Sequence, residues 1–165
     1  MAETDDPGVA LCGIDNALGR AALEDVGFRR IIEAGLGRGT EEYLAFQVHT
    51  FPASRSARDR WGGMTEETAA VNTIHLPAYQ SMAAAGLDQC GLTTLAGRSV
   101  GASFVGAATS TIAIAQLLRM VMGEHRYELI DGTLRSLEYR DAIRYEGPED
   151  PFNPGFTTML ANTFE

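Results

Sequence analysis

The chain has 165 residues, of which 45% are hydrophobic and 8% aromatic, and this composition is typical of one folded globular domain. Its formal net charge is −9, and an acidic surface repels phosphate backbones and anionic lipids, so we expect neither nucleic acid nor a membrane as a partner. Two cysteines without a CxxC spacing exclude a disulfide-rich scaffold, and no zinc site is expected. The N-terminal residues MAETDDPGV lack the basic and apolar segments of a secretory signal, which indicates a cytoplasmic protein.

Short apolar strands alternate with one helix in the first half of the chain. Continuous apolar runs predict the strands, and helical spacing of small and apolar residues predicts the helix, which a glycine ends. The predicted elements are a strand over 8–14, a helix from Ala17 to Gly27, strands over 30–36 and 42–51, and a loop over 52–77.

The second half contains the clearest helical pattern of the chain. This stretch, 98–122, is too polar for a confident membrane span and favours a buried helix capped by Gly123. The other predicted elements are a helix over 78–85, strands over 127–130, 134–139 and 142–145, a turn at Asp131-Gly132, and an irregular tail over 147–165. The order favours an α/β half-domain over 8–146, in which no strand followed by a GxGxxG loop precedes the first strand.

Three segments in a fixed order carry a resemblance to a known family. They are Cys12-Gly13-Ile14-Asp15-Asn16 with Arg20, then Ile32 to Gly37 before the strand through His49, and finally Cys90-Gly91 with Leu95 to Gly106. This order is similar to that of ThiF-type adenylating enzymes, including the MoeB and HesA relatives, which have a ubiquitin-activating-enzyme-like fold. The resemblance covers the C-terminal portion of that fold. It implies a partial doubly wound (Rossmann-like) sheet that lacks the N-terminal glycine-loop unit.

The resemblance assigns ligand roles to three polar residues after the first strand. It implies that Asp15 holds the magnesium ion of ATP, that Asn16 hydrogen-bonds the nucleotide, and that Arg20 holds a phosphate. Each residue also has a structural interpretation. Asp15 and Asn16 are both good helix N-caps, and the spacing of Arg20 favours a surface arginine paired with Glu24 one turn on.

Cys90 matches the cysteine with which some family members form a thioester or persulfide. A thiol before a helix has a lowered pKa, which suits this role, and a buried inert thiol is the alternative. Cys12 lies within a predicted strand and is interpreted as structural. The loop over 52–77 carries a basic-aromatic cluster that suits the carboxylate tail of a protein partner or is simply solvated, namely Arg55, Arg58, Arg60 and Trp61. The three histidines lack metal-ligand spacing and are interpreted as packing or surface residues.

The function that this resemblance implies requires a complementing N-terminal half. With that half, in a homodimer or heterodimer, the chain would use Mg-ATP to activate the C-terminal carboxylate of a ubiquitin-like or sulfur-carrier protein. Without a phosphate loop, we expect the isolated chain to be inactive and to bind ATP weakly. The alternative is a noncatalytic interaction or dimerisation module of a degenerate or truncated relative. A nicotinamide-binding fragment is disfavoured, because Asp-Asn-x-x-x-Arg is not a dinucleotide motif.

Overall fold

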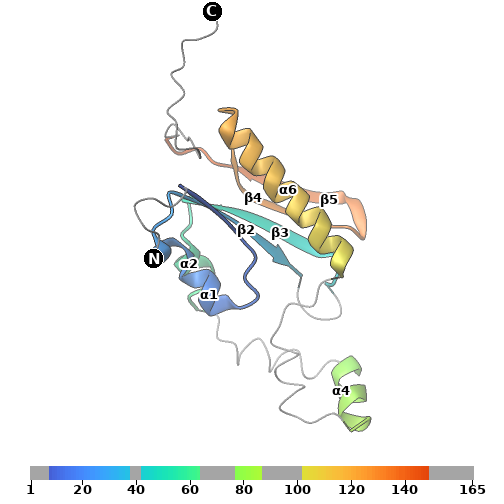
Figure 1. Cartoon of the computed structure of the whole chain (residues 1–165). Coiled ribbons are helices and arrows are strands. Elements are labelled where there is room, and N and C mark those ends of the chain that lie inside the picture. Colours follow the sequence, from blue (N-terminus) through green and yellow to red (C-terminus); the bar gives the residue numbers. More distant parts are fainter. Residues whose placement is uncertain (1–7, 38–41, 64–76, 87–101, 149–165) are drawn as a thin grey trace, which may run out of the picture.

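The computed structural model describes residues 8–37, 42–63, 77–86 and 102–148. These residues form a five-stranded sheet with helices on both faces (Figure 1). The strands are β1 (Val9–Cys12), β2 (Arg30–Leu36), β3 (Ala45–Phe51), β4 (Tyr127–Thr133) and β5 (Ser136–Arg144). The helices are α1 (Ala17–Ala21), the 3₁₀ turn η1 (Leu23–Val26), α2 (Ala57–Trp61), α4 (Pro77–Ala84) and α6 (Ser103–Val121).

The strands lie side by side in chain order, from β1 at one edge to β5 at the other. β1 and β2 are parallel, with Cys12 opposite Glu33, whereas every other neighbouring pair is antiparallel. In the β2–β3 pair, Glu33 lies directly opposite His49. The mixed sheet with its helices confirms the expected α/β class. The doubly wound, Rossmann-like part of that expectation stays a prediction.

Alternate residues of β2 face two separate hydrophobic clusters. Ile31 packs in the cluster under α1 and α2, whereas Ile32 packs in the cluster under α6. Figure 1 shows α6 lying across one face of the sheet and α1 with α2 below the other. The period-2 alternation of a strand therefore places Glu33, two residues after Ile31, on the α1–α2 face.

Two local predictions for residues 17–63 differ from the structure. The helix expected from Ala17 to Gly27 is divided into α1 and η1, and Gly27 ends the second part with a left-handed φ of 94°. The loop expected over 52–77 contains α2, whose first turn is capped by Ser56, which accepts a hydrogen bond from the Asp59 amide. A five-residue helix is too short to produce a recognisable period.

The turn predicted at Asp131-Gly132 is wrong, because both residues lie inside β4 and the chain reverses after Thr133. The glycine has a packing role instead. A Cβ at Gly132 would lie 2.8 Å from the Phe46 ring, which crosses this position from β3. Asp-Gly is therefore explained here by the close approach of an aromatic ring.

By length and composition, α6 is apolar enough to cross a membrane. In the structure it packs against the sheet through one narrow face that includes Val105, Thr109, Ala113, Gln116 and Met120. Only 28% of its most apolar 18-residue window is buried, so the buried helix expected over 98–122 is covered on one side only. Residues 98–101, with which the predicted helix begins, lie outside the described residues, and so does the predicted tail after residue 148.

Candidate functional site

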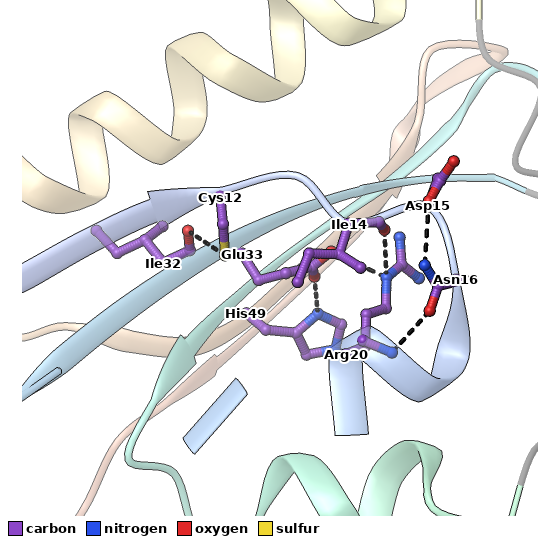
Figure 2. A network of polar contacts seen from close by, with 9 residues as sticks. Cys12, Ile14, Asp15, Asn16, Arg20, Ile32, Glu33 and His49 are labelled. Atoms are coloured by element: carbon purple, nitrogen blue, oxygen red, sulfur yellow. Dashed lines mark hydrogen bonds and ion pairs between the residues drawn. The ribbon is translucent and has the colours of Figure 1, made fainter. Parts of the chain in front are cut away.

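A buried group of charged side chains lies between the sheet and α1 (Figure 2). Glu33 on β2 has no exposed surface, and its Oε1 lies 3.0 Å from Nε of Arg20. Its other oxygen, Oε2, lies 3.3 Å from Nδ1 of His49 on β3. A carboxylate this deeply buried is stable only with such partners, so Glu33 joins α1 to two strands.

Arg20 reaches this position across the main chain of its neighbours. Its Nε donates a hydrogen bond of 2.8 Å to the carbonyl oxygen of Ile14, and its guanidinium lies 5.7 Å from the ring centroid of Trp61. A Cβ on Gly35 would lie 2.9 Å from Nη2 of Arg20, so only glycine leaves this space open. Arg20 is 7% exposed, and the surface pairing with Glu24 that its spacing favours is wrong.

Asp15 and Asn16 form the turn between β1 and α1. Asn16 caps the helix, because its Oδ1 accepts a hydrogen bond of 2.7 Å from the amide of Gly19. Its Nδ2 donates to Oδ1 of Asp15 at 3.3 Å, and the Asp15 carboxylate is otherwise exposed. The capping interpretation therefore holds for Asn16. The Asp15 carboxylate remains accessible to a ligand.

A cavity of about 670 Å³ opens beside Arg20, where β2 ends and β3 begins. Arg20 lines this cavity, and its hydrogen bond to Ile14 and its ion pair with Glu33 both involve Nε. Polar and aromatic groups from α2, β3 and β4 complete the lining, among them Arg60, Trp61, Gln47 and Asp131. The cavity lining therefore combines three arginines, Arg20, Arg60 and Arg135, and an aromatic wall with two carboxylates, Glu42 and Asp131. The arginines are the groups that could hold an anionic ligand.

Glu128 on β4 anchors the segment that brings Arg60 and Trp61 to the cavity. Its two oxygens accept hydrogen bonds from the amide and the hydroxyl of Ser54, at 2.8 and 2.7 Å, and Oε1 lies 4.0 Å from Nη2 of Arg60. Burial raises the pKa of Glu128, but the two hydrogen bonds from Ser54 and the charges of Arg60 and Arg126 lower it below its ordinary value. Glu128 is therefore an ionised anchor near neutral pH.

Cys12 lies next to Glu33 in the parallel β1–β2 pair, and its thiol contacts the carbonyl of Ile32 at 3.7 Å. Burial raises the pKa of this thiol to about 11, with a further increase from the charge of Glu33 and an opposing effect from Arg20. A protonated, half-buried thiol is a poor nucleophile, which agrees with the structural interpretation of Cys12.

The structure brings only part of the predicted site together. Arg20, Arg60 and Trp61 line one cavity, Asp15 lies outside its lining, and Cys90 lies outside the described residues. Arg55 and Arg58 of the basic-aromatic cluster are exposed. Arg55 donates a hydrogen bond to the Asp59 carbonyl, and Arg58 pairs with Asp25. Among the described residues, no group of three His, Cys, Asp or Glu side chains is close enough to hold a metal ion.

The sequence alone assigns no role to Glu33. The only signal was its charge within the apolar run RIIEAGL, where a buried carboxylate requires a cationic partner. His49 was interpreted as a packing or surface residue, and it is buried against Phe51 and Trp61, with ring centroids 6.2 and 4.8 Å away. Its alignment with Glu33 follows from the β2–β3 register, which the sequence alone does not fix.

Comparison with known proteins decides the family. Residues 1–124 match the model of the BilD C-terminal domain. This chain belongs to the BilD C-terminal domain family. It is 42% identical over 156 residues to the "Bacterial E1-like protein BilD" of Collimonas sp. (strain OK412), and the match covers 94% of the chain but 33% of that relative. No solved structure matches the chain significantly.

Membership of the BilD C-terminal domain family confirms the expected resemblance in its coarser form. The relative is an E1-like protein, so the chain corresponds to the C-terminal domain of such a protein. The chain spans about one third of the length of that relative. The narrower assignment to the ThiF, MoeB and HesA group stays a prediction.

Proposed function

We propose that this chain is the C-terminal part of an adenylating enzyme and that the cavity beside Arg20 receives the carboxylate tail of a ubiquitin-like or sulfur-carrier protein. The observation that carries the proposal is the nearly buried Arg20, which lines the cavity and whose hydrogen bond and ion pair to the described residues both involve Nε rather than Nη1 or Nη2. A carboxylate accepts two parallel hydrogen bonds from such a group, which an ammonium cannot reproduce. Support also comes from the name of the relative, which calls that protein E1-like.

Glu33 and Gly35 act on the cavity through Arg20. Glu33 supplies the counter-charge, and the missing side chain of Gly35 gives the guanidinium its place against Trp61. The hydrogen bond from Arg20 to the Ile14 carbonyl fixes the peptide immediately before Asp15. The same arginine therefore orders both the tail cavity and the turn that presents the acidic residue.

Asp15 is our candidate for holding magnesium with ATP. Its carboxylate is exposed and contacts Asn16 alone among the described side chains, and magnesium is commonly held by one or two carboxylates together with phosphate oxygens and water. Bound magnesium would neutralise phosphate charge during attack on the α-phosphorus. In that step the carboxylate oxygen forms a bond to phosphorus, and the bond to the pyrophosphate leaving group breaks. Upstream polypeptide, completing a doubly wound sheet, would supply the phosphate loop, and Cys90 would be the later acceptor.

Trp61 is the only tryptophan of the chain and lines the cavity, so its fluorescence reports on the proposed tail site. We would titrate the chain with triglycine and with its C-terminal amide. The proposal predicts a saturable fluorescence change with the free carboxylate and at least a tenfold weaker response to the amide. Arg20→Lys should weaken the response, whereas Arg58→Lys, on the exposed side of α2, should not. Equal responses to both peptides would refute a carboxylate site.

A noncatalytic interaction module is the second candidate function. The exposed apolar face of α6, which includes Phe104 and Leu118 and continues into Met122 directly after the helix, favours it. A surface helix usually carries charged residues on its outer face, and α6 carries only Arg119. The two candidates differ in the cavity. Only the enzyme requires that Arg20 bind a carboxylate.

A further inference from the structure

The outer edge of β1 lacks a neighbour in the part of the chain that the structure describes. β1 pairs with β2 in parallel, and parallel strands are normally buried inside a sheet with helices on both faces. Here the strand is apolar, yet the side chain of Leu11 is 46% exposed on the side that faces α6. An apolar parallel edge strand is a place where another strand adds.

A groove of about 380 Å³ adjoins this edge, between β1–β2 and α6. Its walls are mostly small or apolar, and they include Leu11, Gly13, Ala34, Gly106, Ser110 and Ile114. A Cβ built on Gly106 meets no atom within 4 Å, so the groove is open above this residue. Small residues in such a wall allow the axis of a second helix to approach to about 8 Å.

The groove continues into the outer face of α6. Ile114 and Val121 lie two turns apart on the helix and are both exposed, next to the exposed Leu118. A contiguous group of exposed apolar side chains is typical of a surface that another molecule or segment covers. The unpaired strand edge and the apolar helix face thus form one continuous surface.

We infer that this surface, the β1 edge together with the α6 groove, is where the upstream polypeptide of longer BilD-like proteins docks, with a strand along β1 and a helix in the groove. The Collimonas relative is about three times as long as the match, and the matching family model is a C-terminal domain, so such proteins carry a long polypeptide before this unit. A strand parallel to β1 needs a crossover connection, and a helix over the α6 face satisfies that requirement.

This inference rests on the complementation part of the proposed function and not on its chemistry. We would co-express the full chain with the part of the Collimonas relative that precedes its matching region. Gel filtration with light scattering would then test for a 1:1 complex in the absence of ATP. Ile114→Glu and Gly106→Leu should each weaken the complex at least tenfold. Ile143→Glu should leave it unchanged, because Ile143 is an exposed residue on β5 at the opposite edge of the sheet.

Circular dichroism of each variant would establish that the chain remains folded. We expect it to, because a side chain at Gly106 has open space around it and Ile114 is already exposed. The inference is overturned if no complex forms or if both groove variants bind as the wild type does. It is also overturned if Ile114→Glu instead dissociates a homodimer of this chain, or abolishes flotation with phosphatidylcholine vesicles. A complex that forms and binds no Mg-ATP would keep this interface and refute the adenylation proposal.

Discussion

The guanidinium of Arg20 occupies the space that a side chain on Gly35 would fill, since its Nη2 lies 2.9 Å from the position of a Cβ there. This relationship joins α1 to the end of β2 and gives Arg20 its place against Trp61. It also explains why a glycine stands within β2 at position 35, because its missing side chain leaves room for the guanidinium from α1.

Gly35→Ala should therefore displace Arg20. The added methyl group meets the end of the guanidinium, which is held at Nε and cannot move freely, so we expect a loss of about 1–3 kcal/mol in the free energy of unfolding. Urea denaturation followed by Trp61 fluorescence measures both the stability and the environment of the cavity wall. Gly63→Ala is the control, because a Cβ at Gly63 meets no atom within 4 Å. Equal stability of the two variants would contradict the packing that we describe.

Glu33→Gln should leave Arg20 buried without its counter-charge. Removing one partner of a buried ion pair typically costs about 3–5 kcal/mol, and we expect a loss in that range. The double variant Arg20→Met, Glu33→Gln should recover part of this loss, since no charge then remains unpaired. Asp25→Asn breaks the exposed pair with Arg58 and should cost less than about 1 kcal/mol. A Glu33→Gln protein as stable as Asp25→Asn would show that the buried pair does not stabilise the fold.

Cys12 should resist alkylation while the protein is folded. Its pKa is raised from 9.0 to about 11, which lowers the thiolate fraction near neutral pH by about 100-fold relative to a free cysteine. Iodoacetamide labelling of Cys90→Ser, followed by mass spectrometry, isolates this thiol. Labelling should be slow in buffer and fast in denaturant. Fast labelling in buffer would contradict the burial of Cys12 beside Glu33.

Glu128 should make the stability depend on pH in the acid range. Its pKa is lower in the folded protein than in the unfolded chain, so ionised Glu128 stabilises the fold above its unfolded pKa, and this contribution disappears as the pH falls through the folded pKa. Glu128→Gln should lower the free energy of unfolding at pH 7 by about 1–3 kcal/mol and flatten the dependence below pH ~4.5. Glu124→Gln, at an exposed pair with Arg119, should keep the wild-type profile. Parallel profiles for all three proteins would refute this role.

The sequence predicted the helices and strands better than the contacts between them. The apolar run RIIEAGL predicted β2 with its observed bounds, because burial on both faces leaves a continuous apolar signature. The turn was predicted at Asp131-Gly132 instead of after Thr133, because Asp-Gly also occurs where a ring from a neighbouring strand needs space. Turn propensity is local, whereas the position of the Phe46 ring depends on the β3–β4 register.

The candidate site shows the same limit. Helical spacing favoured a pair between Arg20 and Glu24, but the Glu24 carboxylate instead accepts a hydrogen bond from the amide of Ala57, at the start of α2. That choice depends on the packing of η1 against the start of α2, where Ala57 lies 33 residues after Glu24 in the chain. The family resemblance assigned Arg20 a phosphate, and that role stays a prediction. The sequence assigned no role to Glu33, because its partners come from α1 and β3 and meet only in the folded protein.

Calorimetry with Mg-ATP tests the central proposal most directly. The sample is the complex of the chain with the upstream part of the Collimonas relative, and the variants are Asp15→Asn and, as a matched exposed carboxylate, Asp25→Asn. We predict saturable binding of Mg-ATP by the wild-type and Asp25→Asn complexes and at least tenfold weaker binding by Asp15→Asn. Absence of binding by the wild-type complex, or equal affinity in all three, would contradict the assignment of this chain to an adenylating enzyme.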